Sequence, residues 1–390
     1  RIDVRREWTF AILISLVSAG ILVGSPKPHP SAAETPGRGA PKKLIYYGWG
    51  TRDTIYARHH WREMEQMPFD GVGITVAIDR AKPTIGEGAT ANLLGWNLFG
   101  PRAFELNDFR PAIADLKAAR WRKFTDNFMV AAIASSGQDH GLTWFDDSRW
   151  QIIANNWRVL AAIAREGGCK GIILDPEHYG LDLFRYAEQR RRVDRPFRVY
   201  RAMARQRGQE LMRAAREVFP DITILCLYGY AVVWNEVRDA QNRGLAKPVE
   251  EAQYGLYPPF LDGMLEVSSP RATIVDGYET AYGFKRREQF ERGREDILRK
   301  AVLLSAVPEH YTRQVQAGFG LWLDYGARWD TREFARNYFQ PAEFSAAVRA
   351  ALEISDRYVW IYSHLPRFFP PENLPDAYLD AIRSGRVIQP

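Results

Sequence analysis

The stretch Cys169-Lys-Gly-Ile-Ile-Leu-Asp-Pro-Glu-His-Tyr-Gly180 contains an apolar run that ends abruptly in charged and aromatic residues. The run 172–174 predicts a buried strand, and Pro176 stops regular strand pairing after it. Side chains alternate along a strand, so Asp175 and Glu177 are expected on one face. Burial of two carboxylates on one face at the end of a core strand costs folding free energy, unless they have bonding partners or serve a function.

Apolar strands alternate with amphipathic helices over most of the remaining chain. Helical spacing is found at 147–166, 200–218, 287–305 and 341–355, and also at 259–267, which is therefore not taken as a strand. Eight strands are expected, at 44–49, 71–78, 128–134, 171–175, 222–228, 272–277, 319–324 and 358–363. Eight strands with intervening helices predict an α/β chain that forms one (β/α)8 barrel over residues 42–390.

Polar and aromatic residues gather where the expected strands end, whereas the strand bodies are mostly aliphatic. In a barrel of parallel strands the carboxyl ends meet at one face, and active sites are built there. This asymmetry predicts an enzyme. The residues at these ends that we expect to contact a substrate are Trp49, Tyr179, Tyr228, Asp276, Trp322, Trp360 and His364.

The carboxylates after the fourth strand suit the cleavage of a glycosidic bond, which needs an acid and a second carboxylate. Glu177 is the expected general acid because its side chain is long and follows Pro176 at the rim. Repulsion from Asp175 would raise the Glu177 pKa, and the shorter, deeper Asp175 suits an orienting role. An ion pair with Lys or Arg that only ties a loop is the structural alternative.

The second carboxylate is either Glu279 or Asp324, because both end expected strands. Asp276 and Glu279 are three residues apart and would point to opposite faces of a continuous strand, so both face inward only if the strand ends between them. Trp360 would form a floor on which the apolar face of a sugar ring stacks, or it is a core residue.

Two other functions use the same strand ends. His178, His140 and His364 could join Asp175 and Glu177 around a metal in a hydrolase or lyase, but no His-x-His or His-x3-His spacing is present. We therefore expect no metal and no other cofactor. A non-catalytic sugar-binding protein of the cell envelope is the remaining alternative.

Residues 171–180 resemble the fourth-strand signature of retaining glycoside hydrolases with Asp-x-Glu-x-Tyr or Asp-x-Glu-Tyr patterns, including the chitinase-like family 18 barrels. The resemblance implies that Glu177 is the acid/base, that Asp175 positions an acetamido group, and that Trp360 lies below the sugar. The chitinase pattern has further Asp residues where this chain has Ile173 and Lys170, and its Tyr is one place earlier. More widely, residues 42–365 look like exported bacterial glycoside hydrolases, which implies a carbohydrate substrate.

The N-terminal residues are typical of an export signal. Three arginines at positions 1–6 precede an apolar run at 8–24 and the small residues Ser31-Ala32-Ala33. We expect a signal peptide at 1–33, a linker at 34–41 and a periplasmic or secreted protein; an uncleaved membrane anchor is the alternative. Removal of 1–33 takes away four Lys/Arg and two Asp/Glu, so the net charge of +6 becomes +4.

The remaining positive charge is mild and scattered, so neither a nucleic-acid partner nor a stable membrane partner is expected after cleavage. Only two cysteines occur, Cys169 and Cys226, in or beside neighbouring expected strands. We expect two buried free thiols rather than a disulfide.

Overall fold

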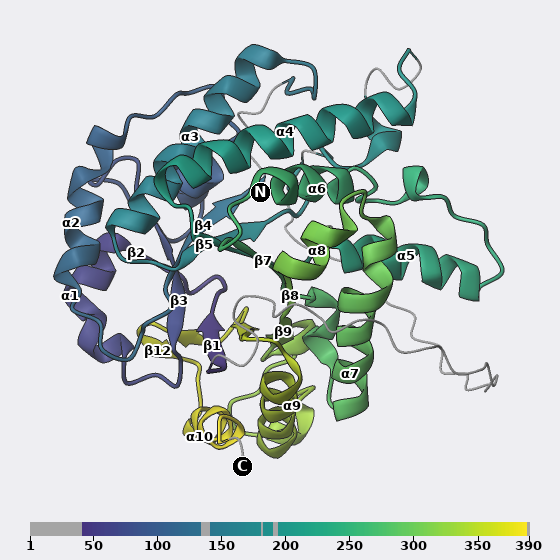
Figure 1. Cartoon of the computed structure of the whole chain (residues 1–390). Coiled ribbons are helices and arrows are strands. Elements are labelled where there is room, and N and C mark those ends of the chain that lie inside the picture. Colours follow the sequence, from purple (N-terminus) through teal and green to yellow (C-terminus); the bar gives the residue numbers. More distant parts are fainter. Residues whose placement is uncertain (1–40, 134–140, 181, 190–193, 388–390) are drawn as a thin grey trace, which may run out of the picture. The chain divides into compact units, whose positions relative to one another are not determined.

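The computed structural model describes residues 41–133, 141–180, 182–189 and 194–387. Helices surround a set of parallel strands (Figure 1). In the described part of the chain the barrel strands are β1 (Lys43–Tyr46), β3 (Gly71–Thr75), β4 (Phe128–Ala132), β5 (Gly171–Asp175), β6 (Thr223–Cys226), β7 (Thr273–Asp276), β8 (Val315–Ala317), β9 (Phe319–Trp322) and β10 (Tyr358–Tyr362). Short additional strands are β2 (Arg52–Asp53), which pairs with β3, and the pair β11 (Arg367–Phe368) and β12 (Pro371–Glu372).

The barrel strands follow the order β8-β7-β6-β5-β4-β3-β1-β10-β9, and all these pairs are parallel. Strands β8 and β9 are two halves of one strand that bends at Gly318, because β8 pairs with β7 and β9 pairs with β10. A Cβ atom at position 318 would lie 2.8 Å from the Val275 side chain and 2.9 Å from the Tyr358 carbonyl oxygen, so close packing at this position favours glycine. The eight expected strands and the (β/α)8 barrel are therefore confirmed.

The helices also agree with the sequence pattern. In the described residues they are α1 (Thr54–Met64), α2 (Arg110–Ala118), α3 (Asp147–Glu166), α4 (Phe197–Val218), α5 (Tyr230–Asn242), α6 (Tyr257–Val267), α7 (Arg287–Glu295), α8 (Pro308–Gln314), α9 (Pro341–Ile354) and α10 (Asp376–Gly385). Helix α3 has the predicted bounds, and its N-cap Asp146 accepts a hydrogen bond from the Arg149 amide. The segment expected as one helix at 287–305 instead contains α7, a π-helical turn (Asp296–Lys300) and a 3-10 turn (Ala301–Leu304).

Large side chains fill the barrel where neighbouring strands carry glycine. Trp360 is fully buried, and its indole Nε1 donates to the Gly277 carbonyl at 2.9 Å. Added Cβ atoms at Gly277 and Gly320 would lie 2.8 and 2.7 Å from the Trp360 indole. Gly73 likewise makes room for the ring of Tyr47, since its Cβ would lie 3.1 Å from that ring. These glycines let two large rings form the floor of the carboxyl end.

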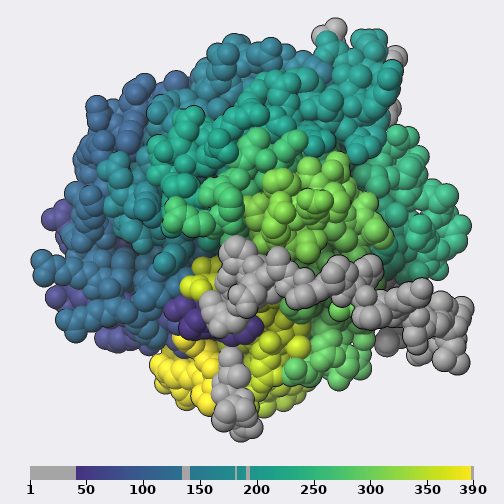
Figure 2. All heavy atoms as spheres, in the orientation of Figure 1, coloured from purple at the N-terminus to yellow at the C-terminus, as the bar shows by residue number. Residues whose placement is uncertain are grey.

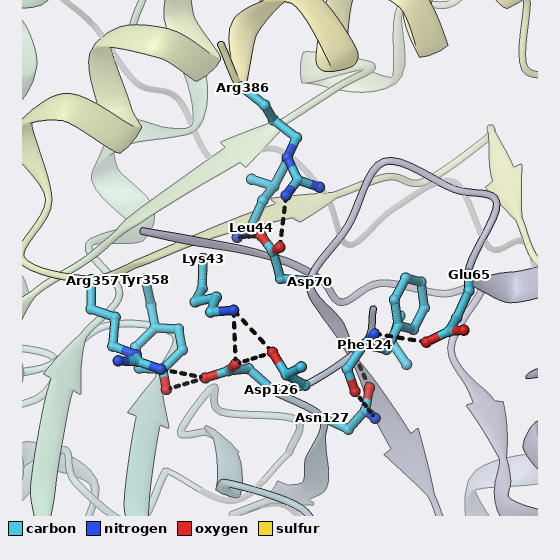
Figure 3. Close-up of polar contacts among 12 residues, drawn as sticks. Lys43, Leu44, Glu65, Asp70, Phe124, Asp126, Asn127, Arg357, Tyr358 and Arg386 are labelled. Atoms are coloured by element: carbon cyan, nitrogen blue, oxygen red, sulfur yellow. Dashed lines mark hydrogen bonds and ion pairs between the residues drawn. The ribbon is translucent and has the colours of Figure 1, made fainter. Parts of the chain in front are cut away.

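Carboxylates at the amino end of the barrel are paired with cations (Figure 3). Asp126 accepts hydrogen bonds from the Arg357 guanidinium at 2.9 Å and the Tyr358 hydroxyl at 2.8 Å. Asp70 accepts from the Leu44 amide at 2.8 Å and from Arg386, at the end of α10, at 2.7 Å. This end therefore joins the first strand to the last strand and to the C-terminal helix, and the corresponding purple and yellow atoms lie side by side in Figure 2.

Both cysteines are buried free thiols, as predicted, and burial raises the pKa of each to about 12. Within the ranges that the structure describes, no helix combines the length and the apolar composition needed to cross a bilayer. The expected signal segment and most of the linker, up to residue 40, lie outside the described residues, as does His140.

Replacement of Asp126 by asparagine should destabilise the barrel. A neutral amide at this position cannot balance the Arg357 charge, and loss of charge-assisted hydrogen bonds costs about 2 kcal/mol. Burial opposes ionisation of Asp126, but hydrogen bonds from Thr125, Arg357 and Tyr358 outweigh it, and its net pKa is lowered. The stability contribution is thus present above the ordinary Asp pKa and lost as the pH falls through the lowered value.

The thermal unfolding midpoint of Asp126→Asn should therefore lie below that of the wild type at pH 7, and the difference should narrow in acid. Asp380→Asn, which removes an exposed ion pair with Arg383, serves as the control and should leave the midpoint unchanged. Equal midpoints for wild type and Asp126→Asn at pH 7 would contradict this role.

Candidate active site

The carboxyl end of the barrel brings together acidic side chains from two strands. Glu177 follows β5 and Glu279 follows β7, and their carboxyl groups are hydrogen-bonded to each other. The Tyr179 hydroxyl, which donates to Asp175, also interacts with Glu177, and the Tyr282 hydroxyl interacts with Glu279. The structure thus assembles Glu177 with one of the two candidates for the second carboxylate.

Asp175 lies beneath this pair, with a residue exposure of 1%. Its Oδ2 accepts hydrogen bonds from the Tyr47 hydroxyl at 3.2 Å and the Tyr179 hydroxyl at 3.0 Å. Its Oδ1 accepts from the Glu177 backbone amide at 3.0 Å. Asp175 therefore fixes the turn that carries Glu177, which is the orienting position expected from its place in the strand.

Burial raises the pKa values of all three carboxyl groups. The pKa of Asp175 is raised to about 8, by burial first and by the Glu177 charge second. The pKa of Glu279 is raised well above its ordinary value by burial and then by the Glu177 charge. The Glu177 pKa is raised, as expected, but the cause is burial rather than repulsion from Asp175.

The cluster has no cationic partner in the described part of the chain. Neither lysine nor arginine forms an ion pair there with Asp175, Glu177 or Glu279. Like charges held this close cannot all ionise at neutral pH, so the cluster retains at least one proton. The structural alternative, an ion pair that ties a loop, finds no support among these residues.

Tyrosine hydroxyls surround the carboxyl groups. Burial, followed by nearby anionic groups, raises the pKa values of Tyr47, Tyr179 and Tyr282, so they are neutral hydrogen-bond donors. Tyr228, expected at the site, packs with Tyr254 at a ring distance of 5.0 Å, and the Glu177 and Glu279 charges contribute to raising the pKa of both. Sequence analysis missed Tyr47, Tyr254 and Tyr282. Of these, only Tyr282 could have been predicted from the sequence, because a residue one helical turn after Glu279 lies on the same side of the chain.

Aromatic rings extend from the carboxyl pair toward the surface. Tyr282 stacks on Tyr362 at 5.7 Å, and Trp322 lies 5.4 Å from Tyr362. Trp49 is 46% exposed and bonds to the Tyr362 hydroxyl. Trp360 differs from expectation, because Tyr47 and Tyr282 lie against it and no part of it is exposed. It supports the floor from below and does not offer a ring surface to a sugar.

Two expected site carboxylates are structural instead. Asp324 is fully buried and accepts hydrogen bonds from the Trp322 indole at 3.0 Å and from the amides of His364 at 2.9 Å and Leu365 at 2.8 Å. It ties the loop after β10 to β9. Asp276 accepts from the amides of Ala231 and Tyr278, at the start of α5 and the end of β7. The carboxyl groups of both residues are therefore occupied by backbone or indole donors.

His178 and His364, the two candidate histidines that the structure describes, do not join the carboxyl pair. His178 stacks on Tyr254 at 4.2 Å, its Nδ1 lies 3.2 Å from Asp182, and burial lowers its pKa to about 4. His364 is exposed beside the Tyr362 hydroxyl. Over the described ranges, no group of three or more His, Cys, Asp or Glu side chains is arranged to hold a metal ion. His178 and His364 therefore do not form, with Asp175 and Glu177, the metal site of the metal-dependent alternative.

Glu279 reaches the site through an unusual backbone turn. The preceding residue, Tyr278, has φ 43° and ψ 62°, the left-handed region that non-glycine residues rarely adopt. Such a conformation costs about 1–3 kcal/mol and persists only where surrounding contacts hold it. The turn ends β7 after Asp276, so Asp276 faces α5 while Glu279 faces Glu177.

No family model matches the chain, and no curated protein matches it either. Among solved structures, it is similar to an endoglucanase of broad specificity from Bacteroides salanitronis, with 11% identity over 94% of this chain and 99% of that one and a TM-score of 0.46. An exo-β-1,4-mannosidase from Opitutaceae bacterium strain TAV5 has 13% identity, coverage of 82% and 51%, and a TM-score of 0.45.

A family 18 chitinase from Pseudoalteromonas aurantia has 12% identity, coverage of 88% and 99%, and a TM-score of 0.40. These solved structures are glycoside hydrolases, and the similarity is distant. The assignment of the barrel rests on the strand register described above.

The buried carboxyl cluster should make stability depend on pH. A carboxyl group whose pKa is raised in the folded state stays protonated where the unfolded chain ionises. Each such group therefore lowers the free energy of unfolding by up to about 1.4 kcal/mol per pH unit between its unfolded and folded pKa values. For Asp175 this range extends from about 4 to about 8.

Asp175→Asn keeps the size of the side chain and removes this titration. The thermal midpoint of the wild type should fall relative to that of Asp175→Asn as the pH rises from 4.5 to 8, a range set by pKa values of about 4 and 8. Glu288→Gln, on the exposed face of α7, should follow the wild type throughout. Parallel pH profiles for wild type and Asp175→Asn would contradict a protonated cluster.

Proposed function

We propose that the chain is a glycoside hydrolase in which Glu177 is the general acid/base and Glu279 the second carboxylate. The observation that carries the proposal is the hydrogen-bonded Glu177–Glu279 pair at the carboxyl end of the barrel. A buried pair of carboxyl groups that shares a proton provides both the acid and the carboxylate that glycosidic cleavage needs. The neighbouring exposed and half-buried aromatic rings suit a carbohydrate substrate.

The larger rise in pKa is that of Glu279, so the shared proton lies on Glu279 in the free protein. In the proposed reaction this proton passes to Glu177, which donates it to the leaving glycosidic oxygen. The Glu279 carboxylate then attacks the anomeric carbon, and a water molecule, deprotonated by Glu177, releases the sugar. Asp175 accepts from the Glu177 amide and so keeps the acid in place, while Tyr282 donates to Glu279. We further propose an oligo- or polysaccharide substrate and an exported protein, the latter on the N-terminal sequence pattern.

A digest of a glycan panel tests this function. The wild type should release sugars from at least one glycan, and Glu177→Gln should reduce kcat by about 10²–10⁴-fold, the usual contribution of general acid–base catalysis. Glu177→Gln preserves size and removes one titrating carboxyl group from the cluster, so its thermal midpoint at pH 7 should lie at or above that of the wild type. Glu288→Gln is the matched control and should retain full activity.

Two outcomes of the digest would count against the proposal. Equal release of sugars by wild type and Glu177→Gln would remove Glu177 from the reaction. Binding of a glycan by both proteins with no release by either would instead favour the non-catalytic sugar-binding alternative.

The stereochemical outcome should be retention. An inverting enzyme holds its carboxyl groups about 6.5–9.5 Å apart to admit a water molecule, whereas a retaining pair is closer, at about 5–5.5 Å. Glu177 and Glu279 interact directly through their side chains, so the proposal uses the shorter, retaining separation. Proton NMR of freshly released sugar should show the anomer of the substrate first, and initial formation of the opposite anomer would exclude Glu279 as the nucleophile.

A further inference from the structure

The turn before Glu279 is held by a buried set of side chains. The Tyr278 hydroxyl donates to Asp296 Oδ2 at 3.1 Å and accepts from the Asn235 amide nitrogen at 3.2 Å. All three residues are buried. Asp296 is the first residue of the π-helical turn Asp296–Lys300, and Asn235 lies on α5.

The Asn235 amide contacts the chain on both sides of Glu279. The same nitrogen that donates to Tyr278 lies 3.3 Å from the Thr280 hydroxyl. The Glu279 backbone amide itself donates to the Leu227 carbonyl at 3.1 Å. Residues 278, 279 and 280 are therefore each attached to neighbouring elements, which fixes the backbone from which the Glu279 side chain extends.

The Tyr278 ring is also enclosed. It packs edge-on against Phe319 at 6.0 Å, and a Cβ atom at Gly293 of α7 would lie 2.8 Å from it. Arg238 pairs with Asp296 at 2.6 Å and so holds the carboxylate that Tyr278 contacts. These contacts maintain the left-handed conformation of Tyr278, from which the chain turns back toward Glu177.

We propose that Tyr278, held by Asn235 and Asp296, is a positioning residue that keeps the Glu279 carboxyl group against Glu177. The inference rests on the proposed function where it treats Glu177 and Glu279 as the reacting pair. Tyr278 itself is buried and would not contact a substrate. It acts through Glu279, whose other titratable neighbours are Asp175, Tyr228, Tyr254 and Tyr282.

The test compares Tyr278→Phe and Asn235→Ala with Tyr311→Phe. Tyr311 is buried beside the same π-helical turn, where its hydroxyl donates to the Ile297 carbonyl at 2.6 Å, but it has no link to Glu279. Tyr278→Phe and Asn235→Ala should lower kcat by about 10- to 100-fold, as small displacements of reacting groups do, with little change in KM. The alkaline limb of their kcat–pH profile should move to lower pH, because the Glu177 charge contributes to the raised pKa of Glu279 and so to the upper apparent pKa of the pair. Tyr311→Phe should change neither.

A second readout needs no glycosidase activity. The thermal midpoint should fall between pH 4.5 and 8, and this fall should be smaller in Tyr278→Phe than in Tyr311→Phe. The range runs from ordinary carboxyl pKa values near 4 to the Asp175 value of about 8. An unchanged fall, or unchanged kcat and alkaline limb in both variants, would overturn the positioning role. A smaller fall in a protein without activity on any glycan would support positioning and refute the proposed function.

Discussion

The enclosure of three carboxyl groups, with Asp175 buried and Glu177 and Glu279 half-buried, without a cationic partner in the described part of the chain is the constraint on which the active-site account depends. Isolated buried charges are too costly to persist, so such a cluster must hold protons at neutral pH. The surrounding structure satisfies the remaining oxygen atoms with tyrosine hydroxyls and a backbone amide, not with guanidinium groups. A proton held in this way is available for transfer, whereas carboxylates in ion pairs would be ionised and would have no proton to donate.

Acidic residues have different partners at the two ends of the barrel. At the amino end, Asp70 and Asp126 are paired with Arg386 and Arg357, and they connect strands that are distant in sequence (Figure 3). At the carboxyl end, Glu177 and Glu279 contact each other. This division agrees with the general behaviour of parallel barrels, in which one face contributes stability and the other carries the chemistry. It also explains why residue type alone does not show which acidic residues of this chain are structural and which belong to the candidate site.

The sequence predicted the barrel and half of the proposed reacting pair, but not the detail of the site. Strand and helix periods are local, so all eight strands and helix α3 were correctly placed. Alternation holds up to Asp175, the last residue of β5, and beyond it the Glu177 amide donates to Asp175, which no strand period predicts. Asp324 could not be separated from Glu279, because its partners, the amides of His364 and Leu365, lie on another loop. Tyr47 was missed since its position depends on Gly73 of a neighbouring strand. The sequence left open whether Trp360 is a platform or a core residue, and it is a core residue because Tyr47 and Tyr282 cover its ring.

The most direct measurement is a carbon NMR titration of carboxyl-labelled glutamate in the unliganded wild type, with Glu177→Gln and Glu279→Gln used to assign the two resonances. The account predicts that Glu177 and Glu279 titrate together, with at least one step well above the ordinary glutamate pKa of about 4.3. Removal of either residue should return the other toward a single, lower step. Two independent titrations near the ordinary value would contradict the shared proton and, with it, the proposed acid.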